Sequence, residues 1–248
     1  MCGRYELHTN PATVALLFGL LQPPAISPRY NIAPMQEVPI VRLAKSGERE
    51  LAQVRWGLVP RWAKDPSIGS RLINARAETL ADKPAFRMAL RRHRCLLPSS
   101  GFYEWKAIPG AGKQPMHIGM ADGEPFALAG LTERWLSPEG EVLDTCAIVT
   151  TQANPLLAPL HDRMPLIIAP DDYARWLDLA EDDVMDLLRP YPGDAMTYYP
   201  VSTRVNAVRN DDASIIERVE EIAPAPVEDR EPELPLEDER VPEQAKLF

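Results

Sequence analysis

A thiol stands one residue from the start of the chain, in the sequence MCGRY. Cysteine is small, so we expect Met1 to be removed, which would give Cys2 a free α-amine beside its thiol. The reference pKa values of these two groups are about 7.7–8.0 and about 8.5, so each is partly reactive near neutral pH. The thiol would be more fully ionised if a cationic neighbour such as Arg4 lowered its pKa.

Two chemistries are open to such a terminal aminothiol. The amine can condense with an aldehyde to an imine, after which the thiolate closes a five-membered thiazolidine ring. Alternatively, the amine can serve as the base for the thiol in an N-terminal nucleophile hydrolase. Cys95 and Cys146 lie in apolar runs without a metal-ligand spacing, so we predict that they are buried as small hydrophobic residues.

Three polar clusters could complete either chemistry. Taken singly, each has a structural explanation: Asn74 could cap a turn, Glu104 could pair with an arginine, and His161 could lie partly exposed on a loop. Together with Cys2 they supply an amide, a carboxylate, an imidazole and a nucleophile, all from protein side chains, so no metal and no organic cofactor is needed. The clusters are LINARAET (Asn74, Arg76, Glu78), GFYEWKA (Glu104) and LHDRMPL (His161, Asp162, Arg163).

Charge is distributed unevenly along the chain, whose net charge is -9. Residues 55–94 hold ten basic against three acidic residues, a net of +7, whereas residues 223–248 hold three against eight, a net of -5. A basic middle with an acidic tail is typical of a protein that binds a polyanion. The alternative for residues 84–94 is a helix with a solvated, arginine-rich face.

The pattern of apolar residues predicts many short strands and a few helices. A helix over 11–20 is capped by Asn10 and has Pro11 at its first position. Residues 37–44 and 49–60 form a hairpin, and further strands follow at 94–99, 102–108, 115–120, 126–136, 142–151, 164–169 and 197–206. Helices are expected at 78–93 (broken before Pro84), 154–160, 170–179 and 181–190.

These elements predict a single α+β domain over residues 1–222. Strands at this regular spacing favour a mainly antiparallel, β-barrel-like core, or a sandwich, with peripheral helices. Residues 223–248 are rich in Pro and Glu and are expected to be disordered. Neither a membrane span nor a signal peptide is evident, so we expect a cytoplasmic protein without a membrane partner.

A series of motifs in this chain resembles the SOS-response-associated peptidase (SRAP) family of abasic-site processing proteins. The resemblance covers roughly residues 2–207 and rests on seven motifs in the family's order. These are MCGRY, RYNIAP (29–34), WGLVPRWA (56–63), INARAET (73–79), GFYEWK (101–106), IVTTQAN (148–154) and HDRMP (161–165).

The resemblance implies capture of the abasic-site aldehyde in single-stranded DNA as a thiazolidine crosslink. Cys2 would be the nucleophile, Asn74 would hydrogen-bond at the lesion, and Glu104 and His161 would be the acid/base pair. Phosphates would be held by Arg4, Arg76 and Arg163, and the DNA path would be lined by Asn31, Pro34 and Trp62, of which the tryptophan offers a stacking face. Such a protein would act at replication forks on the nucleoid, and we expect a monomer.

Two other functions stay open at this point. One is a thiol peptidase or amidohydrolase that acts on its own leader through Cys2. The other is a single-strand-binding module that makes no covalent bond, for which Cys2 would be dispensable.

The chain ends in QAKLF, which resembles the pentapeptide by which bacterial replication proteins bind the β sliding clamp. Gln244, Leu247 and Phe248 match its anchor positions, whereas Ala245 and Lys246 depart from the usual residues between them. The clamp is therefore a candidate partner, and the alternative is an ordinary chain end.

Overall fold

A computed structural model of the chain describes residues 2–180 and 183–224. Its centre is a ring of five strands in the order β10-β4-β3-β6-β9, which closes because β9 also pairs with β10. Only the β4–β10 pair in this ring is parallel, and the predicted barrel-like, mainly antiparallel core is confirmed. The ring consists of β3 (Glu37–Leu43), β4 (Arg49–Trp56), β6 (Arg94–Ser99), β9 (Phe126–Leu136) and β10 (Val142–Gln152).

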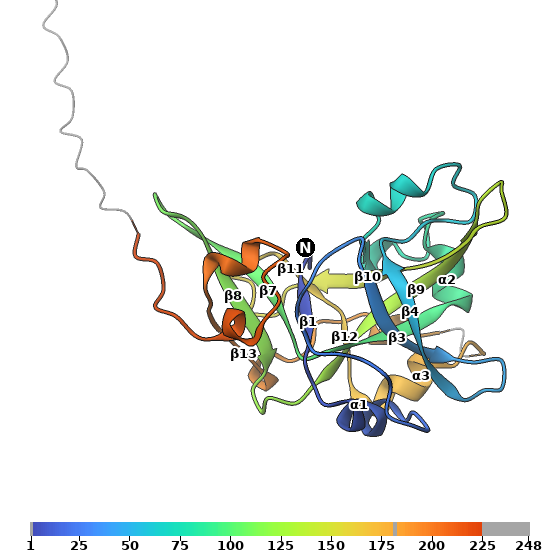
Figure 1. Cartoon of the computed structure of the whole chain (residues 1–248), viewed down its shortest axis with the longest axis horizontal. Helices are drawn as coiled ribbons and strands as arrows, with labels where there is room; N and C mark the ends of the chain where they lie inside the picture. The colour runs from blue at the N-terminus through green and yellow to red at the C-terminus, as the bar shows by residue number, and fades with distance from the viewer. Residues whose placement is uncertain (1, 181–182, 225–248) are drawn as a thin grey trace, which may run out of the picture.

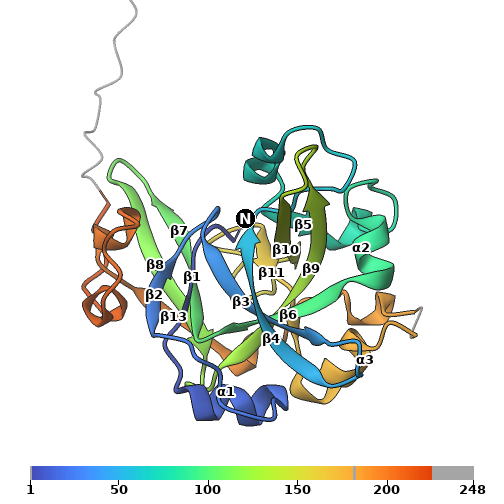
Figure 2. The same ribbon diagram turned by 45° about the vertical axis from the view of Figure 1, so that its right-hand side comes forward.

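A second, antiparallel sheet lies beside the barrel in the order β13-β8-β7-β1-β2 (Figures 1 and 2). In both views the first residues of the chain lie between this sheet and the barrel. The sheet consists of β1 (Tyr5–Leu7), β2 (Arg29–Ile32), β7 (Gly101–Ile108), β8 (Gly112–Met120) and β13 (Met196–Pro200). Three short strands extend the barrel sheet, namely β5 (Asn74–Arg76) and β11 (Arg163–Pro165) on β10 and β12 (Ile167–Ile168) on β9.

Side chains alternate between the two faces of the second sheet, because successive residues of a strand point in opposite directions. On the inner face, Tyr5 meets Trp56 of the barrel edge to face, with ring centroids 5.5 Å apart, and both side chains are fully buried. On the outer face, Tyr103 packs against Val205 and Ile215 of the C-terminal segment. The sheet therefore has a buried layer on each side.

Helices are short and peripheral. The helix predicted over 11–20 is confirmed as α1 (Pro11–Phe18): the Asn10 Oδ1 accepts a hydrogen bond from the Ala12 N–H at 2.8 Å, and Gly19 ends the helix with a φ of 64°. The other α-helices are α2 (Arg87–Arg92) and α3 (Tyr173–Leu177). Seven 3₁₀ turns complete the described chain: η1 (Pro66–Arg71), η2 (Ala77–Thr79), η3 (Pro170–Asp172), η4 (Met185–Leu187), η5 (Gly193–Ala195), η6 (Thr203–Asn206) and η7 (Ala213–Ile216).

Two predicted helices are wrong in extent or in kind. The helix expected over 78–93 is reduced to η2 and α2, because the chain between them turns through Pro84. Residues 154–160 form hydrogen-bonded turns instead of a helix. Pro155 and Pro159 lack the N–H groups that a continuous helix would use.

Three further predictions need correction. The strand expected over 164–169 divides into β11 and β12, because Leu166 donates to Val149 of β10 and accepts from Ala129 of β9. The strand expected over 197–206 ends at Pro200 and continues as η6. Of the helix expected over 181–190, the described part contains only η4, whereas 170–179 holds η3 and α3 as expected.

The predicted burial of Cys95 and Cys146 is confirmed. Arg94 is also buried, and its guanidinium donates to the carbonyls of Leu90, Trp176 and Asp178, so it does not contribute to a basic surface. No helix within the described ranges is long and apolar enough to cross a membrane. Residues 225–248, with Gln244, Leu247 and Phe248, lie outside the described residues, so the disordered tail and the clamp motif stay predictions.

Candidate active site

Cys2 lies directly before β1 and is completely buried. Its carbonyl accepts a hydrogen bond of 2.8 Å from the Asn74 Nδ2. Asn74 begins β5, which pairs with β10 with Asn74 opposite Ile148, so this bond ties the start of the chain to the barrel. The Asn74 Oδ1 is buried and has no hydrogen-bond partner among the described residues, which leaves an acceptor beside Cys2.

The environment of Cys2 favours the protonated thiol. Burial, and then the negative charge of Glu104, raise the pKa of the thiol to about 12, although the Arg4 backbone N–H donates a hydrogen bond that lowers it. The Arg4 side chain therefore does not lower the pKa of the thiol in this structure. The Arg4 guanidinium is engaged elsewhere, because its Nη1 donates to the Asn31 Oδ1 at 2.6 Å and to the Val205 carbonyl at 2.7 Å.

Glu104 acts on the Cys2 thiol, and His161, from another element, acts on Glu104. Glu104 is buried on β7, and this burial raises the pKa of its carboxyl group, whereas the charge of His161 acts to lower it. The His161 Nδ1 accepts a hydrogen bond of 2.9 Å from the Arg163 N–H, which places the proton of neutral His161 on Nε2. The Asp162 carboxylate, 2.7 Å from the same Nδ1, favours a proton there instead.

The three arginines expected to hold phosphates differ in their surroundings. Arg76 is exposed, and Arg4 is half-buried above the ring of Trp105. Arg163 makes two hydrogen bonds to the Glu78 carboxylate, at 2.6 and 3.0 Å, and a third to the Thr150 carbonyl at 2.6 Å. Glu78 therefore fixes Arg163 in this structure.

The residues expected to line the DNA path are not equally accessible. Trp62 has 58% of its surface exposed, and Pro34 is partly buried. Asn31 is completely buried, so its side chain cannot contact a strand in this structure. Its Nδ2 donates instead to the carbonyls of residues 205, 207 and 210, and its Oδ1 accepts from Arg4.

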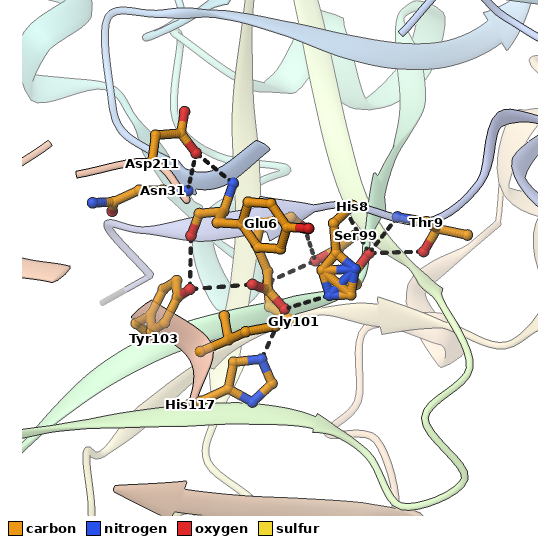
Figure 3. A network of polar contacts seen from close by, with 12 residues as sticks. Glu6, His8, Thr9, Asn31, Ser99, Gly101, Tyr103, His117 and Asp211 are labelled. Carbon is orange, nitrogen blue, oxygen red and sulfur yellow. Dashed lines mark hydrogen bonds and ion pairs between the residues drawn. The ribbon is translucent and has the colours of Figure 1, made fainter. Parts of the chain in front are cut away.

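A buried polar network on the outer face of the second sheet was not predicted (Figure 3). The Glu6 carboxylate is completely buried and lies 2.8 Å from the His117 Nε2 and 3.1 Å from the Tyr103 hydroxyl. A Cβ at Gly101 would lie 2.5 Å from the His117 Nε2, so this position requires glycine. The alternation of Arg4, Glu6 and His8 with Tyr5 and Leu7 is the sequence signal that could have indicated a second buried face.

A sequence model of the family described as SRAP, SOS response associated peptidase, matches residues 1–208. The chain belongs to the SRAP family. No group of three or more His, Cys, Asp or Glu residues that could hold a metal ion occurs in the described part of this SRAP chain.

Relatives of this SRAP chain are known from several organisms. The abasic site processing protein YoqW of Bacillus subtilis (strain 168) is 42% identical over 223 residues, which cover 88% of this chain and 99% of YoqW. The abasic site processing protein HMCES of Gallus gallus is 34% identical over 74% of this chain, a match that covers 64% of HMCES. An X-ray crystal structure of a protein from Bacteroides thetaiotaomicron has a TM-score of 0.76 and 28% identity, covering 88% of this chain and 100% of that protein.

Proposed function

We propose that this protein processes abasic sites in single-stranded DNA by forming a covalent thiazolidine crosslink through Cys2 after Met1 has been removed. The proposal is supported by the names of its relatives, which are abasic site processing proteins. The observation that carries it is the grouping around Cys2 of an amide on β5, a carboxyl group on β7 and, acting on that carboxyl group, an imidazole before β11.

The reaction balances without an oxidant, a reductant or a cofactor. The Cys2 α-amine adds to the ring-opened aldehyde, an acid gives a proton to the carbinolamine hydroxyl, and water leaves to give a protonated imine. The thiol proton then returns to the conjugate base of that acid, the Cys2 sulfur forms a C–S bond to the imine carbon, and the nitrogen becomes the neutral amine of the ring. One water is lost for each crosslink formed.

The raised pKa of Glu104 suits this sequence of proton transfers. A carboxyl group that keeps its proton nearer to neutral pH can donate it to the leaving hydroxyl, and the resulting carboxylate can then accept the proton of the thiol. Such a base is needed, because burial raises the pKa of the Cys2 thiol and so favours its protonated form. His161, which acts on the charge of Glu104, would assist in opening the sugar ring and in reversal.

We assign the DNA path to three arginines, of which Arg76 is exposed, Arg4 is half-buried and Arg163 is mostly buried and paired with Glu78. Arg4, Arg76 and Arg163 would hold phosphates, and the exposed ring of Trp62 would stack on a base. Pro34 would line the same path, whereas Asn31 would act from behind it through Arg4. An abasic nucleotide enters such a site easily, since no base has to be unstacked.

The test is a denaturing gel of protein incubated with a single-stranded oligonucleotide that carries one abasic site. Wild-type protein should give a shifted covalent band, and Cys2→Ala and a form shown by mass spectrometry to retain Met1 should give none. Absence of the band with wild-type protein would refute the proposal. A band that persists in Cys2→Ala would move the chemistry to a lysine Schiff base.

The same assay separates the other two functions. A thiol peptidase would cleave a peptide bond and give no shifted band. A non-covalent binding module would retard the oligonucleotide on a native gel and give no band on the denaturing gel.

We also propose, from the sequence of the tail, that Gln244, Leu247 and Phe248 bind the β sliding clamp. A tether that carries apolar anchors would raise the local concentration of the protein near single-stranded DNA at replication forks. A pull-down in which the clamp is retained equally by the full chain and by a chain lacking residues 244–248 would refute this.

A further inference from the structure

The C-terminal segment 201–219 folds back over the outer face of the second sheet. Val201, Val205 and Ile215 are completely buried there and pack with Tyr103 of β7. Figure 1 shows this segment, in orange, beside β7 and β8. Its last turns lie beyond residue 208, where the match to the family ends.

Asp211 joins this segment to β2. Its Oδ1 accepts hydrogen bonds from the backbone N–H groups of Tyr30 and Asn31, and its Oδ2 pairs with the Arg29 guanidinium. Figure 3 shows the carboxylate beside these two N–H groups. Since β2 is the edge strand of its sheet, these bonds satisfy backbone donors that have no strand neighbour on that side.

Asn31 links Asp211 to Arg4, because it forms hydrogen bonds with both residues. Its backbone is held by Asp211, its Nδ2 is held by the carbonyls of Val205, Ala207 and Asn210, and its Oδ1 accepts from the Arg4 Nη1. The same Nη1 also donates to the Val205 carbonyl. The Arg4 Nη1 is thus held by Asn31 and by the Val205 carbonyl. The Nη2 makes no hydrogen bond to any residue that the structure describes.

We propose that Asp211 is a positioning residue for Arg4: it sets the guanidinium, through Asn31, so that the Nη2 meets a DNA phosphate. This inference rests on the proposed function, in which Arg4 holds a phosphate near Cys2. A guanidinium that is already oriented loses less entropy when it binds a phosphate, so Asp211 contributes to DNA affinity without touching DNA.

The test measures non-covalent affinity and covalent rate separately. Affinity is measured with a single-stranded oligonucleotide that carries a tetrahydrofuran abasic analogue, which has no aldehyde and cannot crosslink. The rate is measured at saturating concentration of an oligonucleotide with a true abasic site. Asp211→Ala should raise the Kd about tenfold and change the saturated rate less than twofold, because Arg4 acts in binding.

Three comparisons decide whether Asp211 acts through Arg4. Asp211→Asn keeps an oxygen for the two N–H groups and loses only the ion pair, so its Kd should lie between those of wild type and Asp211→Ala. In an Arg4→Ala background, Asp211→Ala should have no further effect. Asp144→Ala is the matched control, since it removes a similarly half-buried carboxylate from Arg134 on the barrel and should bind as wild type does.

The salt dependence gives a readout that general loosening of the fold would not. Asp211→Ala should lower the slope of log K against log salt by about 0.7, the contribution of one phosphate contact in single-stranded DNA. An unchanged Kd, or an equal loss in the wild-type and Arg4→Ala backgrounds, would overturn the inference. Failure of the proposed function is distinct from this, because wild-type protein would then bind the analogue and give no covalent band with the true abasic site.

Discussion

Cys2 combines a reactive position with a protective environment. Its burial raises the pKa of the thiol and so favours the protonated form, which is the less nucleophilic one. Reaction then requires a base at the site and an aldehyde brought next to it. Asn74 holds the Cys2 carbonyl, and the charge of Glu104 acts on the thiol; under the proposed function these two residues would make reactivity depend on a bound lesion.

Glu104→Gln should slow the crosslinking reaction and should also change how stability depends on pH. Crosslinking should slow about 10²-fold, the lower range for loss of a general acid–base group. Burial raises the pKa of Glu104 in the folded state, so wild-type protein loses stability as pH rises through that pKa, and the glutamine variant does not.

Thermal melts of both proteins between pH 4 and pH 8 check this sign. The Tm of the variant, measured relative to that of wild type, should increase as pH rises. Glu133→Gln removes another buried carboxylate, one paired with Arg61, and should leave crosslinking unchanged. A stability difference between the two proteins that stays constant, or shifts toward wild type, from pH 4 to pH 8 would contradict the account of Glu104.

At the scale of elements, β1 is the connection between the two faces of the second sheet. Tyr5 and Leu7 anchor it in the barrel core, and Glu6 anchors it in the buried network with His117 and Tyr103. Both anchors lie within five residues of Cys2. Cys2 is thus held by a strand of only three residues that is fixed from both sides.

Gly101→Ala should destabilise the protein by about 1–3 kcal/mol, the usual cost of overpacking a core. The new Cβ would lie 2.5 Å from the His117 Nε2 and 2.8 Å from the Glu6 Oε1. Urea denaturation measures the loss. Gly119→Ala is the control, because its Cβ would lie at an ordinary 3.4 Å from the His117 ring, and equal losses in the two variants would count against the network.

Arg163→Lys should weaken DNA binding about tenfold, since a lysine cannot make both the paired bonds to Glu78 and the bond to the Thr150 carbonyl. These bonds connect η2, β10 and β11 at the edge of the site. Arg134→Lys alters the other two-bond arginine–carboxylate pair on the barrel and is the control. Equal Kd values for both variants and wild type would refute a role for Arg163 in holding phosphate.

At the scale of the whole molecule, the candidate site lies where the second sheet meets the barrel. The strands at 126–136 and 142–151 could be predicted because long apolar runs are a local signal, and α1 because its cap and its proline are adjacent in the sequence. The second pairing of β9 with β10, which closes the barrel, and the crossing of the chain at Leu166 depend on residues far apart in the sequence.

The same limit applies to the site. Cys2, Asn74, Glu104 and His161 could be proposed from the sequence because their residue types carry chemistry. The burial of Asn31 was missed because its partners are carbonyls more than 170 residues away, and backbone carbonyls leave no mark in a sequence. Glu6 was missed because a charged residue in a strand normally predicts an exposed face.

The most direct test of the central claim is the intact mass of the product formed with an abasic oligonucleotide, followed by mapping of the modified peptide. The account predicts the sum of the chain without Met1 and the DNA, less one water, with the modification on the peptide that begins at Cys2. A modification on a lysine, or a product that still contains Met1, would contradict it.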